Sequence, residues 1–249
     1  HNQVMMRALQ SDSPPAYIHL LNPDTVLEPG AVLALRSAFD RDRQIGCVGS
    51  QMINMKRGLQ PAGFRLANIR TEFARGAHTH ILIRLLFSRP PLIYAGDDTS
   101  QIEAVSGASF MVRTAALGEV GLFDTGFFLY FEEFEWMNRF RAQGWAIAHE
   151  PLSRVHHVGG AATKLSQDRE VLVRSPRPFY WYQSQRRYLY RVLGVTRGRI
   201  AGLAWFLGYA LIACPRAIFS RKVRMRFVKN EVWDMLRAWT ACGSFDHQS

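Results

Sequence analysis

The sequence has too few cysteines, too widely spaced, for a disulfide scaffold. It contains three, Cys47, Cys214 and Cys242, with no CxxC pair, which also excludes a cysteine-built zinc site and suits a reducing compartment. Charged residues make up only 20% of the 249 residues, and apolar residues make up 48%. This balance excludes a disordered chain, and the length allows a sizeable core in one large or two small domains.

Acidic residues are scarce in the last third of the sequence. Residues 174–240 hold 14 Lys or Arg against two Asp or Glu, whereas residues 1–173 hold 17 of each kind. We therefore expect a balanced globular domain over residues 1–173 and a basic C-terminal region over residues 174–249.

A long hydrophobic run is also missing. The longest uncharged stretch, Ile200–Pro215, has sixteen residues, about 24 Å as a helix against a hydrocarbon core of about 30 Å. Arg221–Trp239 follows as an expected basic amphipathic helix. These features favour a helical region that associates peripherally with an anionic membrane surface, and two helices of a C-terminal core are the alternative.

The first half alternates short apolar runs with helical patterns, which is typical of an α/β fold. Tyr17–Leu21 and Ile45–Gly49 are expected strands, and Pro29 is placed to begin a helix that reaches about Asp40. Residues 54–100 have no clear period and are expected to form a long excursion over the sheet. Further strands are expected at 102–106, 109–112, 145–149 and 154–157, and further helices at 114–120 and 132–143. The opening nine residues are typical of the middle of a helix, with no leader before them, so we expect a fragment.

Asn22-Pro23-Asp24 closes the first expected strand. We expect this strand to be parallel to its neighbours, and a carboxylate at the end of a parallel strand points into the crevice where α/β folds bind ligands. Beside an asparagine, it can hold a divalent cation that shares its ligands with phosphate oxygens. The same tripeptide is also ordinary turn chemistry, and both interpretations stay open.

A cluster of acids begins the expected helix at 132–143. Glu132, Glu133 and Glu135 lie within four residues and are surrounded by aromatic residues. Acids at a helix N-terminus complement the helix dipole, which is one explanation. Crowded carboxylates near apolar surface also have raised pKa values, as a general base requires.

Two adjacent histidines, His156 and His157, end the last expected strand, before Gly159-Gly160. Side chains alternate across a strand, so only one of the two rings can face a given site.

Together these motifs resemble family 2 glycosyltransferases of the GT-A fold, specifically the rhamnosyltransferase-like branch. The segments that carry the resemblance are Leu20–Thr25 (LLNPDT), Val105–Arg113 (VSGASFMVR), Val120–Asp124 (VGLFD), Phe127–Glu133 (FFLYFEE), His157–Gly160 (HVGG) and the aromatic and arginine segment Phe179–Tyr190. The resemblance implies a Rossmann-like mixed sheet flanked by helices, which makes residues 1–173 the catalytic domain. It also implies that the first strands of the nucleotide-binding sheet are absent from this sequence, and a fragment of an active enzyme that is inactive alone is one alternative.

The resemblance also implies a role for each candidate residue. Asp24 would bind the metal, with Asn22 in place of the first acid of the DxD-type motif, and Glu133 would be the catalytic base beside Glu132. His157 would complete the metal site, with His156 as the second choice. Ser106 and Gly107 would approach the donor sugar, since Gly lacks a Cβ. The acceptor pocket would be lined by Asp124, Tyr130 and Trp136.

The implied activity is an inverting transfer of a sugar, possibly rhamnose, from a nucleoside-diphosphate sugar to a lipid-linked or glycan acceptor in cell-surface polysaccharide synthesis. It implies Mg²⁺ or Mn²⁺ and a place on the cytoplasmic face of the bacterial inner membrane. A processive polysaccharide synthase is one alternative, since Gln183–Arg186 faintly resembles its Gln-x-x-Arg-Trp motif, although Arg187 replaces the Trp. A basic nucleic-acid-binding protein is another alternative, but the acid cluster argues against nucleic acid as a partner.

Overall fold

A computed structural model describes residues 1–54, 58–61, 63–78, 92–93, 102–157, 177–224, 227–228 and 230–240. The chain forms two compact units. The first contains His1–Leu66, Leu92–Asp124 and Glu133–Lys164, and the second contains Ala67–Pro91, Thr125–Glu132 and Leu165–Ser249. The C-terminal helices are therefore joined by two earlier segments, which a boundary near residue 173 did not anticipate.

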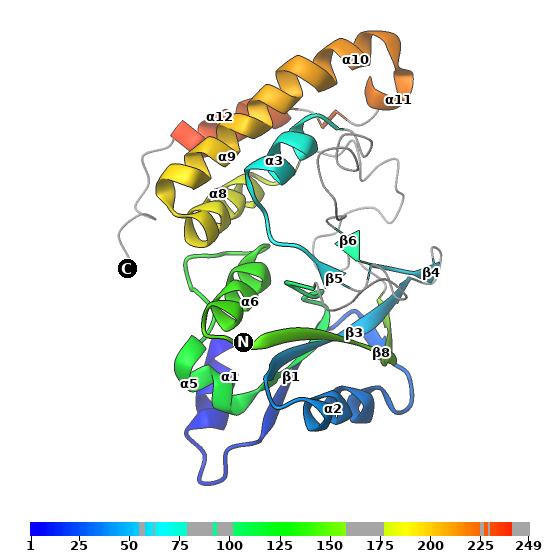
Figure 1. Ribbon diagram of the computed structural model, residues 1–249, viewed down its shortest axis with the longest axis vertical. Coiled ribbons are helices and arrows are strands. Elements are labelled where there is room, and N and C mark those ends of the chain that lie inside the picture. Colours follow the sequence, from blue (N-terminus) through cyan, green and yellow to red (C-terminus); the bar gives the residue numbers. More distant parts are fainter. Residues whose placement is uncertain are drawn as a thin grey trace. The chain divides into compact units, whose positions relative to one another are not determined.

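The first unit is built on a mixed sheet (Figure 1). Its strands run in the order β1 (Tyr17–Leu21), β7 (Ser109–Arg113), β3 (Ile45–Asn54), β8 (Ala146–His157) and β2 (Thr25–Leu27), with β4 (Gly58–Leu59) on β3. Strands β3 and β8 pair in parallel and the other pairs are antiparallel. A separate pair consists of β5 (Gly63–Phe64) and β6 (Leu92–Ile93). The mixed sheet flanked by helices confirms the predicted fold class.

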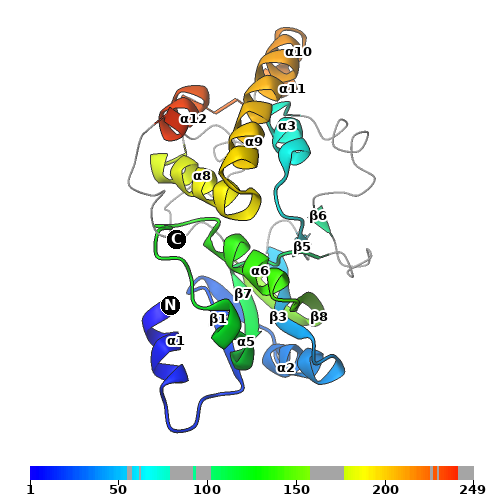
Figure 2. The same cartoon turned by 60° about the vertical axis from the view of Figure 1, so that its left-hand side comes forward.

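Helices α2 (Ala31–Arg41) and α6 (Glu132–Ala142) cover opposite faces of the sheet (Figure 2). Two successive residues of β7 show this arrangement, because neighbours on a strand point to opposite faces. Met111 belongs to the cluster formed with Leu35 of α2, whereas Phe110 contacts Trp136 of α6 at a ring separation of 6.1 Å. Helices α1 (Asn2–Leu9) and α5 (Thr114–Val120) complete the unit and confirm two further predicted helices.

Three predicted elements of this unit differ in the structure. Among the described residues, the predicted strand at 102–106 forms a single bridge, between Ala104 and Phe64, rather than a full ladder with a neighbouring strand. The two short strands predicted at 145–149 and 154–157 are a single strand, β8. Pro29 lies outside α2, whose N-cap is Gly30 at a φ of +85°. Strand β2 follows the Asn-Pro-Asp turn directly and was not predicted.

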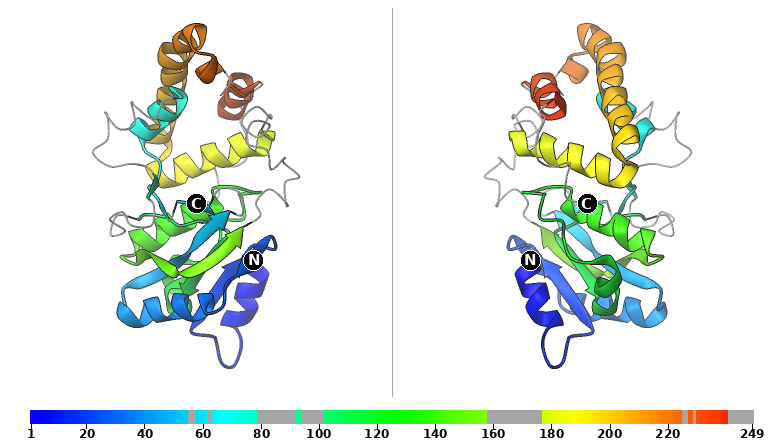
Figure 3. Two further views of the ribbon diagram at one scale, coloured as in Figure 1. Left: turned by 90° about the vertical axis from the view of Figure 1, so that its right-hand side faces the viewer. Right: turned by 90° about the vertical axis from the view of Figure 1, so that its left-hand side faces the viewer.

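The second unit is helical (Figure 3). It contains α3 (Ile69–Gly76), α8 (Phe179–Leu193), α9 (Val195–Gly208), the π-helix η2 (Tyr209–Ala213), α10 (Cys214–Phe219), α11 (Arg221–Arg224) and α12 (Glu231–Thr240). Tyr182, Trp205, Met235 and Ala238 form its buried cluster. Helix α3 was missed within the aperiodic stretch 54–100, although its capping box between Asn68 and Thr71 is a recognisable start signal.

The aromatic and arginine segment of α8 packs inside this unit. Arg186 and Arg187 are only 5% and 8% exposed, and Gln185 donates to Glu72 at 3.0 Å. Arg187 lies over the ring of Phe127, 5.5 Å from its centroid. Buried arginines offer no surface to a phosphate backbone, so this segment gives no support to the nucleic-acid alternative.

The helix that contains the uncharged stretch is longer than predicted. Helices α9, η2 and α10 run as one 25-residue helix, Val195–Phe219, which by length and composition alone could cross a membrane. The π-helix ends at Ala213, two residues before Pro215, and its widened turn accommodates the backbone donor that proline lacks. The single amphipathic helix predicted at Arg221–Trp239 is wrong, because α11 ends at Arg224 and α12 begins at Glu231.

Candidate active site

The Asn22-Pro23-Asp24 turn lies beside the Ser106–Ala108 segment. The backbone N–H of Asn22 donates to the carbonyl of Ala108 at 2.9 Å, and the N–H of Thr25 donates back to the carbonyl of Asn22 at 3.3 Å. The hydroxyl of Thr25 donates to that same carbonyl at 2.5 Å. The tripeptide therefore does form a turn, and this turn holds the Asp24 backbone at the end of β1.

Pairing of β2 with β8 then brings a histidine to Asp24. Thr25 lies opposite His157 in the antiparallel register, and the Nε2 of His157 is 3.4 Å from the Oδ1 of Asp24. His156 is turned away: its Nε2 lies 2.9 Å from the Oε1 of Glu28. The two adjacent rings therefore have different partners, as strand alternation predicts.

Asp24 and His157 are a chemically suitable pair for a divalent cation that also binds phosphate. A carboxylate oxygen and an imidazole nitrogen at this separation are both common metal ligands. Among the residues that the structure describes, no group of three or more His, Cys, Asp or Glu is arranged to hold a metal. A cation here would take its remaining ligands from water and from phosphate oxygens, as Mg²⁺ usually does.

Glu133 lies directly over Gly107. A Cβ added to Gly107 would be 3.0 Å from the Oε1 of Glu133 and 3.2 Å from its Cδ and Cγ. A glycine at position 107 therefore lets the Glu133 side chain approach the backbone closely without a displacement. The turn that carries Asp24 is bonded to Ala108, so backbone contacts connect the Asp24–His157 pair with Glu133.

Replacing Gly107 with Ala is expected to displace the Glu133 carboxylate by a few tenths of an ångström. We expect catalysis to fall about tenfold, since misplacement of a reacting group by about 1 Å can cost 100-fold. The free energy of unfolding should change little. Turnover and urea unfolding measure the two effects. Gly118→Ala is the matched control, because its Cβ would meet nothing within 4 Å. Full activity of Gly107→Ala would contradict the close approach of Glu133 to Gly107.

The other two acids of the cluster have different environments. Burial raises the pKa of Glu132, against a smaller lowering by a backbone hydrogen bond. Its Oε2 is buried without a hydrogen-bond partner in the part of the chain that the structure describes. Glu135 is held by Arg139, with the Nε 3.0 Å from the Oε1, so its charge is already neutralised.

The loop before the acids has a strained backbone. Tyr130 and Phe131 both have left-handed conformations, with φ values of +70° and +68°, which cost about 1–3 kcal/mol each unless the surroundings hold them. Within the second unit, the Tyr130 ring stacks on Tyr180 at 6.1 Å and the Phe131 ring stacks on Tyr188 at 5.4 Å. Tyr130 is half-buried, and α8 fixes the conformation of this loop.

The structure corrects the role expected of Trp136. Its side chain is fully buried, and its Nε1 donates to the carbonyl of Gly121 at 2.8 Å. The ring packs against Phe123 at 4.2 Å. Trp136 therefore fills the core rather than lining an acceptor pocket, whereas Asp124, at the end of the same loop, is half-buried.

Arg139 and Asn2 hold the loop of residues 120–124, and the sequence predicted neither contact. Arg139 donates to the carbonyl of Val120 and to that of Leu122 at 2.7 Å. Asn2 donates to the carbonyl of Phe123 at 2.8 Å and accepts from its N–H at 3.1 Å. Together with Trp136, these side chains satisfy four successive carbonyls, from Val120 to Phe123. Arg139 therefore fixes the backbone of the Val120–Phe123 loop.

Arg139→Ala is expected to lower the free energy of unfolding by about 2–3 kcal/mol, because it leaves two loop carbonyls and the Glu135 carboxylate without their donor. Urea unfolding measures the change. Arg141→Ala is the matched control: Arg141 is a partly exposed arginine of the same helix, paired with Glu103 at 3.2 Å, and should cost no more than about 1 kcal/mol. Equal effects of the two substitutions would contradict the clamp, by which we mean the hydrogen bonds of Arg139 to the carbonyls of Val120 and Leu122.

Comparison with known proteins gives a sequence match to rhamnosyltransferases, which agrees with the resemblance found in the motifs. No protein-family model matches the chain. The chain is 26% identical over 147 residues to the N-acetylglucosaminyl-diphospho-decaprenol L-rhamnosyltransferases of two Mycobacterium tuberculosis strains, CDC 1551 / Oshkosh and H37Rv. The match covers 57% of this chain and 46% of each relative, so the matched region spans about half the length of these relatives.

Two solved glycosyltransferases are loosely similar. GalNAc-T7 with UDP, GalNAc and Mn²⁺ aligns at a TM-score of 0.41 and 16% identity, over 86% of this chain and 44% of that one. The mannosyltransferase PcManGT from Pyrobaculum calidifontis, with GDP-Man and Mn²⁺, aligns at 0.43 and 10% identity, over 96% and 64%. The sequence match, not these alignments, confirms the resemblance to rhamnosyltransferase-like glycosyltransferases.

Proposed function

We propose that this protein is an inverting family 2 glycosyltransferase that moves L-rhamnose from a nucleoside-diphosphate donor to a polyprenyl-diphosphate-linked sugar in cell-wall synthesis. The observation that carries the proposal is the contact path at one end of the sheet. It links the Asp24–His157 pair, through the bond between Asn22 and Ala108, to Glu133 over Gly107. The donor and acceptor classes follow the names of the two mycobacterial relatives.

In this proposal each side chain has one task. Asp24 and His157 bind Mg²⁺ or Mn²⁺, which when bound offsets the charge that builds on the diphosphate leaving group. Glu133 accepts the proton of the acceptor hydroxyl. At the same time the acceptor's hydroxyl oxygen bonds to the anomeric carbon of the donor sugar, and the bond between that carbon and the diphosphate breaks. A single displacement of this kind inverts the anomeric configuration. The backbone at Ser106 and Gly107 borders the donor, and Asp124 borders the acceptor. A contact of Tyr130 with the acceptor stays a prediction.

Transfer of label into a lipid product tests this function. The protein is incubated with Mn²⁺, N-acetylglucosaminyl-diphospho-polyprenol and a panel of radiolabelled nucleoside-diphosphate sugars that includes L-rhamnose. We expect label in the organic phase from the rhamnose donor, dependent on both acceptor and cation. Transfer from another sugar alone would overturn the donor assignment. With the full-length protein, absence of transfer from every donor would overturn the function.

A further inference from the structure

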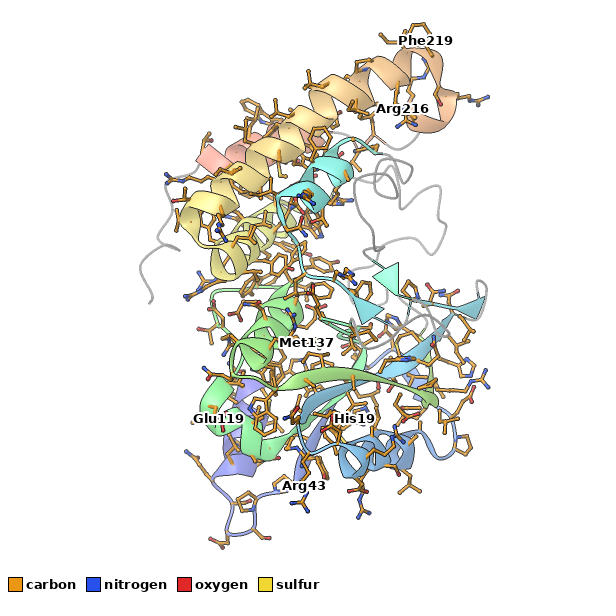
Figure 4. All side chains as sticks on the ribbon, viewed as in Figure 1. His19, Arg43, Glu119, Met137, Arg216 and Phe219 are labelled. Atoms are coloured by element: carbon orange, nitrogen blue, oxygen red, sulfur yellow. The ribbon has the colours of Figure 1, made fainter. Side chains whose placement is uncertain are left out.

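The 25-residue helix Val195–Phe219 has an exposed apolar stripe along one side. Its large exposed residues follow a helical spacing: Ile200, Leu203, Leu207, Leu211, Ile218 and Phe219, which are between 44% and 90% exposed. Figure 4 labels Phe219 at the end of α10 and Arg216 one turn before it. Only 28% of the most apolar window is buried, which is too little for the core helix of a soluble protein.

The opposite side of this helix is packed against protein. A Cβ on Gly76 of α3 would lie 2.0 Å from the carbonyl oxygen of Trp205, and one on Gly208 would lie 2.1 Å from that of Phe73. These two glycines let the backbones of α3 and α9 touch. Gly202 is equally close to the Trp239 ring of α12, at 2.5 Å. Among the residues that the structure describes, the helix is therefore packed along its inner side and exposed along its outer side.

Basic residues occur at both ends of the apolar stripe. Residues 191–224 contain seven Lys or Arg and no Asp or Glu. Arg197 and Arg199 precede the stripe, Arg221 and Arg224 follow it, and all four are exposed. A bilayer with anionic headgroups matches this surface, because each nearby basic residue contributes about 1 kcal/mol of attraction and the apolar side chains enter the interface.

The packing also distinguishes an in-plane helix from a spanning one. At about 1.5 Å per residue, the helix is about 37 Å long, enough to cross a hydrocarbon core of about 30 Å. Crossing would require α9 either to leave α3 or to carry Arg70, Glu72 and Arg75 of α3 into the bilayer, at about 3 kcal/mol for each charge near the centre. Lying in the plane costs neither.

We propose that the outer side of α9–α10 lies flat in the headgroup region of an anionic membrane, with Ile200, Leu207 and Leu211 inserted. This deepens the proposed function, since a polyprenyl-linked acceptor resides in that bilayer, and places the enzyme on the anionic, cytoplasmic leaflet. Binding itself needs neither donor nor acceptor, so it can be tested separately from transfer.

Vesicle sedimentation of the whole protein tests the stripe. We expect binding to vesicles of phosphatidylglycerol and phosphatidylcholine, and weaker binding to phosphatidylcholine alone. Leu207→Asp together with Leu211→Asp should lower the partition coefficient at least about tenfold. Leu33→Asp on α2, a leucine that is 66% exposed, is the control and should bind as the unmodified protein. Equal binding by the double variant, or equal loss in the control, would overturn the proposal.

A second measurement needs no change to the stripe. Cys214 is exposed between Leu211 and Ile218, whereas Cys47 is buried, so in a Cys242→Ser variant a maleimide reports on Cys214. We expect anionic vesicles to slow its labelling, and a carbonate wash at alkaline pH with high salt to release the protein. Unchanged labelling would contradict contact with the membrane. Retention through the wash would contradict the in-plane arrangement in favour of a span.

Discussion

Glu133→Gln is expected to lower the rate of sugar transfer by about three orders of magnitude, within the range of a lost general base. Glutamine has nearly the same volume as glutamate and can still occupy the space over Gly107, so the fold should be retained. Donor binding should also be retained, because the change removes only the proton acceptor. Single-turnover transfer and calorimetric titration with the donor measure the two quantities.

Glu132→Gln is the matched control for this prediction. Burial raises the pKa of Glu132, and in the proposed mechanism this group does not receive the acceptor's proton. We expect a loss of less than about tenfold, well below the range of a lost general base. A far larger loss at Glu132 than at Glu133 would show that the base is the first acid of the pair.

Asp24→Ala is expected to weaken binding of the donor and of Mn²⁺ together, each by about 100-fold, and to reduce transfer to background. The reason is that in the proposed mechanism the Asp24 carboxylate is one of two side chains that bind the cation, whose interaction with the diphosphate would contribute several kcal/mol. Titration of Mn²⁺ with and without nucleoside diphosphate measures this coupling. Full turnover of the unmodified protein in excess chelator would contradict the role of the metal.

Glu28→Ala is the control on the other side of the same strand pair. Glu28 contacts His156 at 2.9 Å and Arg154 at 3.6 Å, so its removal takes away a partly exposed carboxylate without touching Asp24. Metal and donor binding should stay unchanged. A loss equal to that of Asp24→Ala would show a general electrostatic effect rather than coordination.

Local patterns in the sequence predicted much of this site. A short apolar run located β1, turn chemistry located Asn22–Asp24, and strand alternation predicted that His156 and His157 would face different ways. These inferences worked because each depends on a few consecutive residues. The pairing of β2 with β8 determines which histidine lies beside Asp24. These two strands are far apart in the sequence, so a local pattern does not reveal the pairing.

The wrong or missing predictions arose where contacts between residues far apart in the sequence determine the structure. Ile102–Ser106 is apolar enough for a strand but has only one bridge to Phe64. The family resemblance placed Trp136 in the acceptor pocket, although its helical spacing to Phe140, also fully buried, indicated the core. The clamp by Arg139 could not be predicted, because its carbonyl acceptors are 17 and 19 residues away.

The most direct test of the site is pulsed electron paramagnetic resonance of Mn²⁺ bound to the protein with a nucleoside diphosphate. An imidazole nitrogen that binds Mn²⁺ gives a characteristic modulation of the electron spin echo. The account predicts the signal of one imidazole, lost in His157→Ala and retained in His156→Ala, because only His157 lies beside Asp24. A signal that survives in His157→Ala, or its absence from the unmodified protein, would contradict the account.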